Sequence, residues 1–369
     1  NNITLVDNNN TGVVLTNSGL RIESPSGNKF YANYRGVSRA QAASLTAKGR
    51  VAAGTRFKWG GAPNFPGIWD ISTTLGIMAT EDNTVVTIFG YDPNCEFRLQ
   101  ENVGGITDNT IQVSLNAGES YVLEAYRNVT TANIAGWLGA SIQATNNIVI
   151  SNGGLNYGVA QSNLWARDAG IDQPVPEDKL GKDYIFVRGN GTNETEFAII
   201  IATQDQTNVY VNGAIDPVAT LDNGDYYIVA GTNYSGLVPG SNMYVRTSKE
   251  AYAYQNIAGA AWVQTSGLNF VAPVNCLLPD NLDNIPNITD MAGTAVTGGV
   301  TIIAATNTPA ANINVTDSNG PVTLPAAQPV AGNTDWKTFF IPNLTGNVSA
   351  QSTGPMAIGF FGTNDNRGV

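Results

Sequence analysis

The chain has 369 residues, of which 13% are charged, and 18 Lys and Arg against 29 Asp and Glu give a formal net charge of −11. An acidic surface repels phosphate groups, so we expect neither nucleic acid nor anionic lipid as a partner. The absence of histidine excludes histidine acid–base catalysis and histidine metal ligation.

The N-terminal part begins with Ile22 to Ala32, which reads as a strand, a polar turn and a second strand. The connector that follows contains Gln41 to Ala47, the best candidate for a helix in the chain. No apolar run approaches the ~20 residues of a membrane-spanning helix, so we expect no membrane span in this chain.

The next feature is a repeated strand-turn-strand motif. Ala79 to Gly90 (ATEDNTVVTIFG) aligns without a gap with Ala202 to Gly213 (ATQDQTNVYVNG), and Ile302 to Val315 is a weaker third copy. We predict that each copy is a β-hairpin. Phe197 to Ala202 is an apolar run rich in Ile, which predicts a strand buried on both faces. The pair Asn212-Gly213 favours a turn with positive φ.

Two further motifs recur in the same order after the first. Leu115 to Leu123 matches Leu221 to Val229, and both place a glycine, an acid and a tyrosine at the predicted turn. The third motif is a short strand, a polar turn and an alternating strand, and its copies are Ile142 to Ile150, Val245 to Ala253 and Ala350 to Ile358. The N-terminal segment Ile22 to Ala32 has the same form with two extra turn residues.

These repeats predict an all-β chain of tandem β-sandwich units, Ig-like or jelly-roll-like, arranged in an elongated row. The period is about 105–120 residues, the size of one small sandwich. We place a partial β unit with its connector at 1–60, and β-sandwich units at 61–165, 166–272 and 273–369.

The motifs ATEDNTVVTI, LNAGESYVL and LGKDYIF resemble the N-terminal repeat region of IgGFc-binding proteins, a β module of large secreted surface proteins of Bacteroidetes. The stretch Leu268 to Ile288 resembles a passage in such proteins that carry gliding-motility-associated, type 9 secretion sorting domains. The resemblance covers residues 19 to 369. It implies an extracellular or cell-surface protein of adhesive character. It does not imply immunoglobulin binding, and it carries over no ligand-binding residue.

The acidic residues at the predicted turns are weighed as metal ligands and as catalysts. Asp82 and Asp205 offer too few carboxylates for a Ca²⁺ site, which needs six to eight oxygen ligands, so we interpret them as turn-capping residues. Glu119 and Asp225 lie in separate units, whereas a glycosidase needs two carboxylates about 5–9.5 Å apart. We therefore predict no catalytic residue, no metal site and no cofactor.

Two kinds of covalent modification are consistent with the sequence. Cys95 and Cys276 can form one disulfide in an oxidising compartment, although two cysteines also occur together by chance. Ten N-x-S/T sequons are present, and several are expected by chance in a chain rich in Asn and Thr. The candidate glycosylation sites are Asn128, Asn193, Asn233 and Asn287.

The first functional hypothesis is a non-catalytic extracellular protein, an adhesin or a structural spacer, with other surface proteins or glycans as partners. An alternative is a subunit of an extracellular filament or sheath, in which a strand from a neighbouring chain completes the first unit by self-association. The third hypothesis is a glycan-processing enzyme, which requires two acidic side chains facing each other in a deep groove.

Overall fold

The computed structural model describes residues 8–16, 18–28, 30–38, 41–65, 71–162, 166–258, 266–275, 277–364 and 367–368. These residues form strands and short 3₁₀ helices, with no α-helix among them, so the predicted all-β class is confirmed. The 3₁₀ helices are Asn8–Asn10, Gly49–Ala52, Thr131–Ile134, Glu177–Lys179, Gly231–Asn233 and Ala310–Asn312.

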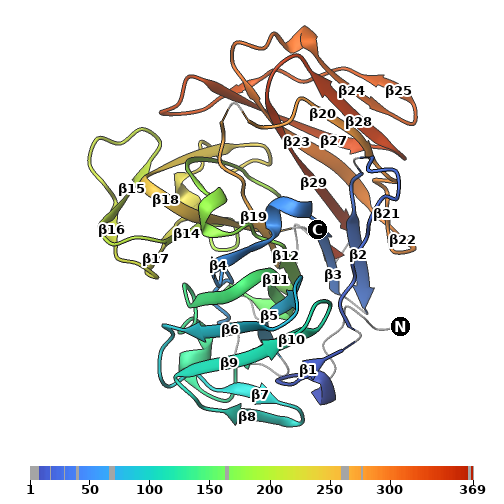
Figure 1. The fold of residues 1–369 in the computed structure, drawn as a ribbon. Helices are drawn as coiled ribbons and strands as arrows, with labels where there is room; N and C mark the ends of the chain where they lie inside the picture. The colour runs from blue at the N-terminus through green and yellow to red at the C-terminus, as the bar shows by residue number, and fades with distance from the viewer. Residues whose placement is uncertain are drawn as a thin grey trace.

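The strands form three groups, which Figure 1 shows as the cyan-green, yellow and orange-red parts of the ribbon. In the first group, one half of the sheet has the order β10-β5-β11-β12 and the other half the order β4-β11-β6-β9. A two-residue strand, β1, extends the first half at β10, and β7 and β8 pair separately. The strands are β1 (Val14–Leu15), β4 (Gly54–Lys58), β5 (Ser72–Ala79), β6 (Thr84–Phe89), β7 (Phe97–Leu99), β8 (Asn102–Ile106), β9 (Thr110–Leu115), β10 (Ser120–Tyr126), β11 (Ser141–Gly158) and β12 (Arg167–Asp172).

The second group repeats this pairing with its own strands. Its halves have the orders β17-β14-β18-β19 and β13-β18-β15-β16. The strands are β13 (Gly181–Val187), β14 (Phe197–Ala202), β15 (Thr207–Val211), β16 (Ala219–Leu221), β17 (Tyr226–Val229), β18 (Asn242–Ala258) and β19 (Ser266–Phe270).

The third group has the same order again, in two separate sheets: β27-β23-β29-β30, extended by β26, and β20-β28-β24-β25. A small pair, β21 and β22, precedes β23. The strands are β20 (Asn281–Ile285), β21 (Asp290–Met291), β22 (Thr294–Ala295), β23 (Thr297–Ala305), β24 (Ile313–Asp317), β25 (Gly320–Val322), β26 (Gln328–Pro329), β27 (Trp336–Leu344), β28 (Val348–Ser352), β29 (Met356–Asn364) and β30 (Arg367–Gly368).

The repeated strand-turn-strand motif occupies the same place in each group, but the prediction that it is a hairpin is wrong. In the second group β14 pairs with β17 and β18, whereas β15 pairs with β16 and β18, so the two strands do not pair with each other. The polar turn between them carries the chain from one half of the sheet to the other. The predicted Asn212-Gly213 turn is confirmed, because both residues have positive φ, 50° and 79°.

The third motif forms the strand that joins the two halves. In the first two groups it is one long strand, β11 or β18, rather than two strands separated by a turn. The early part of β18 pairs with β13 and β15, and its later part pairs with β14 and β19. Only the third group keeps the predicted turn, between β28 and β29.

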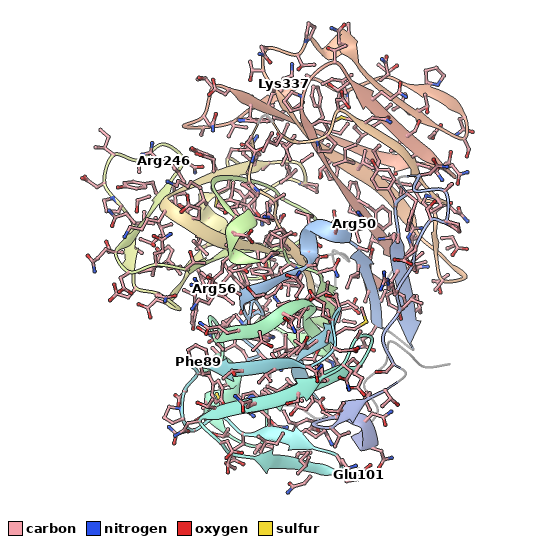
Figure 2. The ribbon with its side chains drawn as sticks, viewed as in Figure 1. Arg50, Arg56, Phe89, Glu101, Arg246 and Lys337 are labelled. Atoms are coloured by element: carbon pink, nitrogen blue, oxygen red, sulfur yellow. The ribbon has the colours of Figure 1, made fainter. Side chains whose placement is uncertain are left out.

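The apolar strand β14 confirms the prediction of burial on both faces, since all six of its residues are buried. Ala198, Ile200 and Ala202 face the core of the second group. Phe197, Ile199 and Ile201 face a second core, shared with residues of the first group such as Tyr157. This strand therefore joins the interior of one group to its neighbour. Figure 2 shows how side chains fill the spaces between the sheets.

A hairpin at the N-terminal side connects the first and third groups. It consists of β2 (Asn33–Ser38) and β3 (Gln41–Thr46), so the predicted helix at Gln41 to Ala47 is wrong. Pairing with β2 satisfies the backbone of this segment, and the backbone N–H of Ala42 donates to Asp168 Oδ1 of β12 at 2.6 Å. These tertiary hydrogen bonds outweigh a weak helix propensity.

The three groups do not lie in an elongated row, and that part of the fold prediction is wrong. Arg35 Nη1 donates to the carbonyl oxygens of Asn287 and Asp290 of the third group, both at 2.9 Å. Tyr31 Oη donates to the carbonyl of Asn281 at 3.0 Å. The N-terminal hairpin thus bridges the first and third groups, and Figure 1 shows it between them.

The predicted unit limits remain predictions. Strands β4 and β12 lie on either side of the predicted unit 61–165, and both pair with β11 inside it. The first group therefore draws strands from both neighbouring segments.

Candidate functional site

Large apolar side chains are exposed on two loops of the second group. The loop after β15 carries Ile215, which is 92% exposed, and the loop before β18 carries Leu237 and Val238, 72% and 67% exposed. Exposed apolar side chains on loops that a rigid scaffold positions are common in binding surfaces. We define the loop surface as residues 213–218 and 235–240.

The two loops begin at the same end of the second group, where Asn212 connects them. Its backbone N–H donates to the carbonyl of Tyr244, and its Oδ1 accepts from the N–H of the same residue, at 2.8 and 3.0 Å. Its Nδ2 donates to the carbonyl of Asn233 at 2.7 Å. The end of β15 is therefore bonded to β18 and to the segment that leads into the second loop.

A buried arginine supports the loop surface from within. Arg188 is 1% exposed, and its guanidinium donates to Asn193 Oδ1 at 2.9 Å and to the carbonyls of Gly191 and Gly231 at 2.7 and 3.3 Å. Its own carbonyl accepts from the N–H of Gly240 at 2.8 Å. The guanidinium thus holds two loop segments, because it donates in several directions at once, and the backbone carbonyl of Arg188 holds a third.

Glu196 lies beside this arginine and is fully buried. Its Oε1 accepts from the backbone N–H groups of Gly191 and Ala258, each at 3.0 Å, and Gly189 also donates to the carboxylate. Desolvation raises the pKa of Glu196 to about 7, against the opposing effect of these donors and of Arg188. Within the described residues, Glu196 Oε2 and Arg188 Nε have no hydrogen-bond partner.

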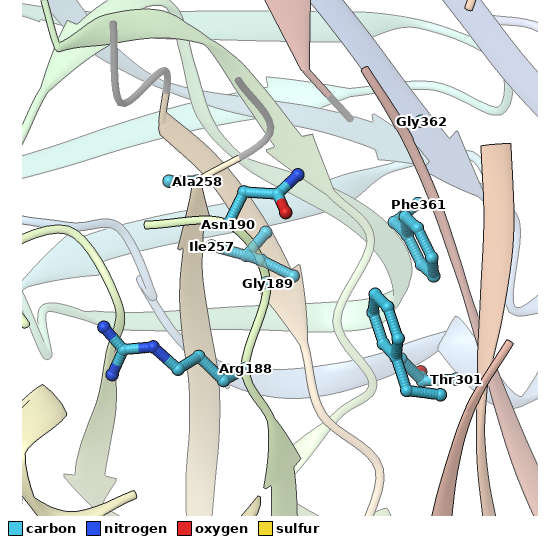
Figure 3. Close-up of a pocket in the computed structure, with 9 residues that line it drawn as sticks. Arg188, Gly189, Asn190, Ile257, Ala258, Thr301, Phe361 and Gly362 are labelled. Atoms are coloured by element: carbon cyan, nitrogen blue, oxygen red, sulfur yellow. The ribbon is translucent and has the colours of Figure 1, made fainter. Parts of the chain in front are cut away.

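A small cavity separates this network from the third group. It has a volume of about 10 Å³ and is lined by Arg188 and Asn190 on one side and by Phe340 and Phe361 on the other. That volume is at the lower limit for a single water molecule. Figure 3 shows the guanidinium of Arg188 pointing away from Phe361. The cavity is therefore too small for a substrate.

The acidic residues of the first repeated turn are capping residues, but they cap a neighbouring turn and not their own turn as interpreted from the sequence. Asp205 Oδ1 accepts from the backbone N–H of Asn223 at 2.9 Å, and Asp82 Oδ1 accepts from that of Ala117 at 3.0 Å. The accepting carboxylates lie in the turn of the first repeated motif, and the donating N–H groups lie in the turn of the second motif. The caps therefore join two turns in each group, rather than closing a turn on itself.

Glu119 and Asp225 occupy equivalent places in the first and second groups. Glu119 Oε2 accepts from the N–H of Asn116 at 2.7 Å, and Asp225 Oδ2 accepts from that of Asp222 at 3.0 Å. Each carboxylate is thus used within its own turn. Among the described residues, no group of three or more Cys, Asp or Glu side chains is arranged to hold a metal ion.

Cys95 is a free thiol in the core of the first group and is 1% exposed. Burial raises the pKa of this thiol to about 12, with a smaller contribution from Asp92. The predicted disulfide with Cys276 remains a prediction. Cys276 itself lies outside the described residues.

The four candidate glycosylation sites differ in how their side chains are used. Asn128 and Asn287 are exposed. Asn193 is half-buried and accepts from Arg188, and Asn233 Nδ2 donates to the carbonyl of Ala230 at 3.0 Å. Glycosylation remains a prediction at all four, and the two exposed residues are the better acceptors.

Nothing in the sequence directly indicates the loop surface or the residues that support it. Arg188 and Glu196 flank a Gly- and Asn-rich loop, where charged residues are normally solvated. The one available signal was an isolated apolar residue between turn-forming residues, as in Ala214-Ile215-Asp216-Pro217. A lone apolar residue at the surface is common, so this signal is weak without the fold.

The described part of the chain contains no helix long and apolar enough to cross a membrane. The IgGFc binding protein family matches residues 42–362. The chain therefore belongs to this family of extracellular binding proteins. No curated protein and no solved structure matches the chain.

Proposed function

We propose that the chain is a non-catalytic, adhesin-like protein of the cell surface, in which three sandwich-like units hold the loop surface in a fixed position. The observation that carries this proposal is the exposure of Ile215, Leu237 and Val238 on loops that Asn212 and Arg188 attach to the body. Exposing these side chains to water costs free energy that a partner surface would recover.

The partner that fits is another surface protein or a glycan. An exposed apolar patch is typical of protein–protein contacts. The family description names IgG Fc, which makes an Fc fragment one probe to include. Secretion by the type 9 system and a role in gliding motility of Bacteroidetes are also proposed, and their support is the likeness of Leu268 to Ile288 to such proteins.

The absence of a catalytic role is part of the proposal. Its support is that Asp82, Asp205, Glu119 and Asp225 all accept hydrogen bonds from the backbone. The filament alternative needs a neighbouring chain to complete the N-terminal unit, whereas Arg35 bonds to the third group of the same chain. We therefore favour the adhesin-like function over both alternatives.

The test is direct binding by the full chain. The immobilised protein is exposed to an IgG Fc fragment, to mucin glycoprotein and to a glycan array, and release of sugars from the glycans is measured in parallel. The proposal expects saturable binding to at least one probe without product formation. Hydrolysis of a glycan, or no saturable binding to any of these probes, would contradict it.

A further inference from the structure

An exposed extended segment near the N-terminus has the properties of an unpaired strand. Residues 18–24 contain no turn, bend or helix, and among the described residues Leu20 to Glu23 take part in no strand pairing. Leu20 and Ile22 are 59% and 54% exposed. An extended segment with unpaired backbone groups is a template for pairing with another strand.

The start of the segment is held in place by the first group. Ser18 Oγ is hydrogen-bonded to Ser120 Oγ of the first group, and Gly19 packs directly against Met78. Further along the chain, beyond the turn at residues 25–26, the hydroxyl of Tyr31 donates to the carbonyl of Asn281 of the third group. A segment already fixed in the extended form loses little entropy when it pairs.

The same sequence motif is covered by neighbouring strands wherever else it occurs in the chain. The residues that align with Ile22 are Ile142 in β11, Val245 in β18 and Ala350 in β28. Their exposed fractions are 0%, 0% and 1%. In those places strands on one or both sides pair with the motif. A strand is therefore the kind of partner that fits Leu20 to Ser24.

The charges of the segment indicate which strand that is. Arg21 and Glu23 lie on one side of the segment, and Leu20 and Ile22 lie on the other, because side chains alternate along an extended chain. Arg21 and Glu23 are 72% and 65% exposed at their side chains and contact each other. If two copies pair antiparallel with Ile22 opposite Ile22, each Arg21 faces the Glu23 of the other copy.

We propose that two copies of this chain associate through an antiparallel pairing of Leu20 to Ser24, centred on Ile22. The pairing places two opposite-charge pairs on one face and the apolar side chains on the other, and cross-strand pairs of both kinds are stabilising. It ends at Pro25, which has no N–H to donate. A two-fold contact of this kind closes on itself and yields a dimer. It does not depend on the proposed binding function.

The test is sedimentation velocity of the full chain from low micromolar to near-millimolar concentration, since a contact this small is weak. We expect a monomer–dimer equilibrium. Arg21→Glu places like charges opposite each other twice, and we expect it to raise the dissociation constant roughly tenfold. Ile22→Lys should have a similar effect, and Arg21→Glu/Glu23→Arg should restore the original constant.

The matched control is Leu277→Lys, which changes a more exposed apolar residue that lies outside both the segment and the loop surface, and it should leave the dissociation constant unchanged. All substituted side chains are exposed, so circular dichroism should show the same fold in every variant. A chain that stays monomeric over the whole range overturns the proposal. The proposal is also overturned if Arg21→Glu leaves the dissociation constant of the dimer unchanged, or if Arg21→Glu/Glu23→Arg does not restore it.

Discussion

The carboxylate of Asp205 accepts a hydrogen bond from the backbone N–H of Asn223 at 2.9 Å, across two turns of the second group. Asp82 and Ala117 repeat this contact in the first group.

We expect Asp205→Ala to lower the free energy of unfolding by about 1 kcal/mol, because the N–H of Asn223 loses an ionised acceptor at a partly solvated site. Urea denaturation measures the change. Asp216→Ala, on the exposed loop after β15, is the control. A stability that rises with Ca²⁺ and loses that response in Asp205→Ala would contradict the capping role.

The strand β14 should be the most sensitive element of the fold. Ile199 and Ile200 are fully buried on opposite faces, so Ile199→Ala and Ile200→Ala should each cost about 2–5 kcal/mol of stability. Ile215→Ala, at an exposed position, should change stability by less than about 0.5 kcal/mol. Denaturant unfolding compares the three. Equal effects at the buried and exposed positions would be inconsistent with β14 lying between two cores.

Part of this architecture could be predicted from sequence. An Ile-rich apolar run predicts a buried strand whatever its partners are, and this held for Phe197 to Ala202. A polar turn between two strands, in contrast, looks the same whether the strands pair or join two halves of a sheet. The distinction depends on β18, whose partners in β14 and β15 lie 34 to 59 residues earlier along the chain.

The candidate site was less accessible to prediction. Arg188 and Glu196 are charged residues in a loop, and nothing in their local sequence signals that Asn193, Gly231 and Ala258 will enclose them. The N-terminal hairpin illustrates the same limit, since Gln41 to Ala47 becomes a strand because β2 and Asp168 satisfy its backbone.

Glu196 should make stability depend on pH in an unusual direction. Its pKa rises from 4.5 in the reference state to about 7 in the folded protein, so the folded state holds this proton more tightly than the unfolded state does. The contribution of protonated Glu196 to the free energy of unfolding is fully present below pH 4.5 and is lost as pH rises through 7. Its size should be about 3 kcal/mol.

Glu196→Gln isolates this contribution, because glutamine is close in shape to the protonated acid. Urea unfolding at pH 5 and pH 8 should show that the wild type loses more stability than the variant on going to pH 8. If the two proteins lose the same stability between pH 5 and pH 8, the folded protein does not change the charge of Glu196 over this range, and the prediction is wrong.

Cys95 should be unreactive in the folded protein. Burial and a pKa of about 12 keep the thiol protonated at neutral pH, and the thiolate is the reactive form. In a Cys276→Ser variant, we expect no labelling by a thiol reagent under native conditions and complete labelling in denaturant. Rapid labelling of the native variant would mean that Cys95 is accessible.

The central claim is that the loop surface of the second group binds the partner. The most direct measurement compares the full chain with Ile215→Lys/Leu237→Lys against whichever of the Fc fragment, mucin or array glycans the wild type binds. Leu277→Lys, another highly exposed leucine, is the control. The account predicts that the double variant loses at least about tenfold in affinity while the control binds like the wild type. Equal binding by all three proteins would contradict it.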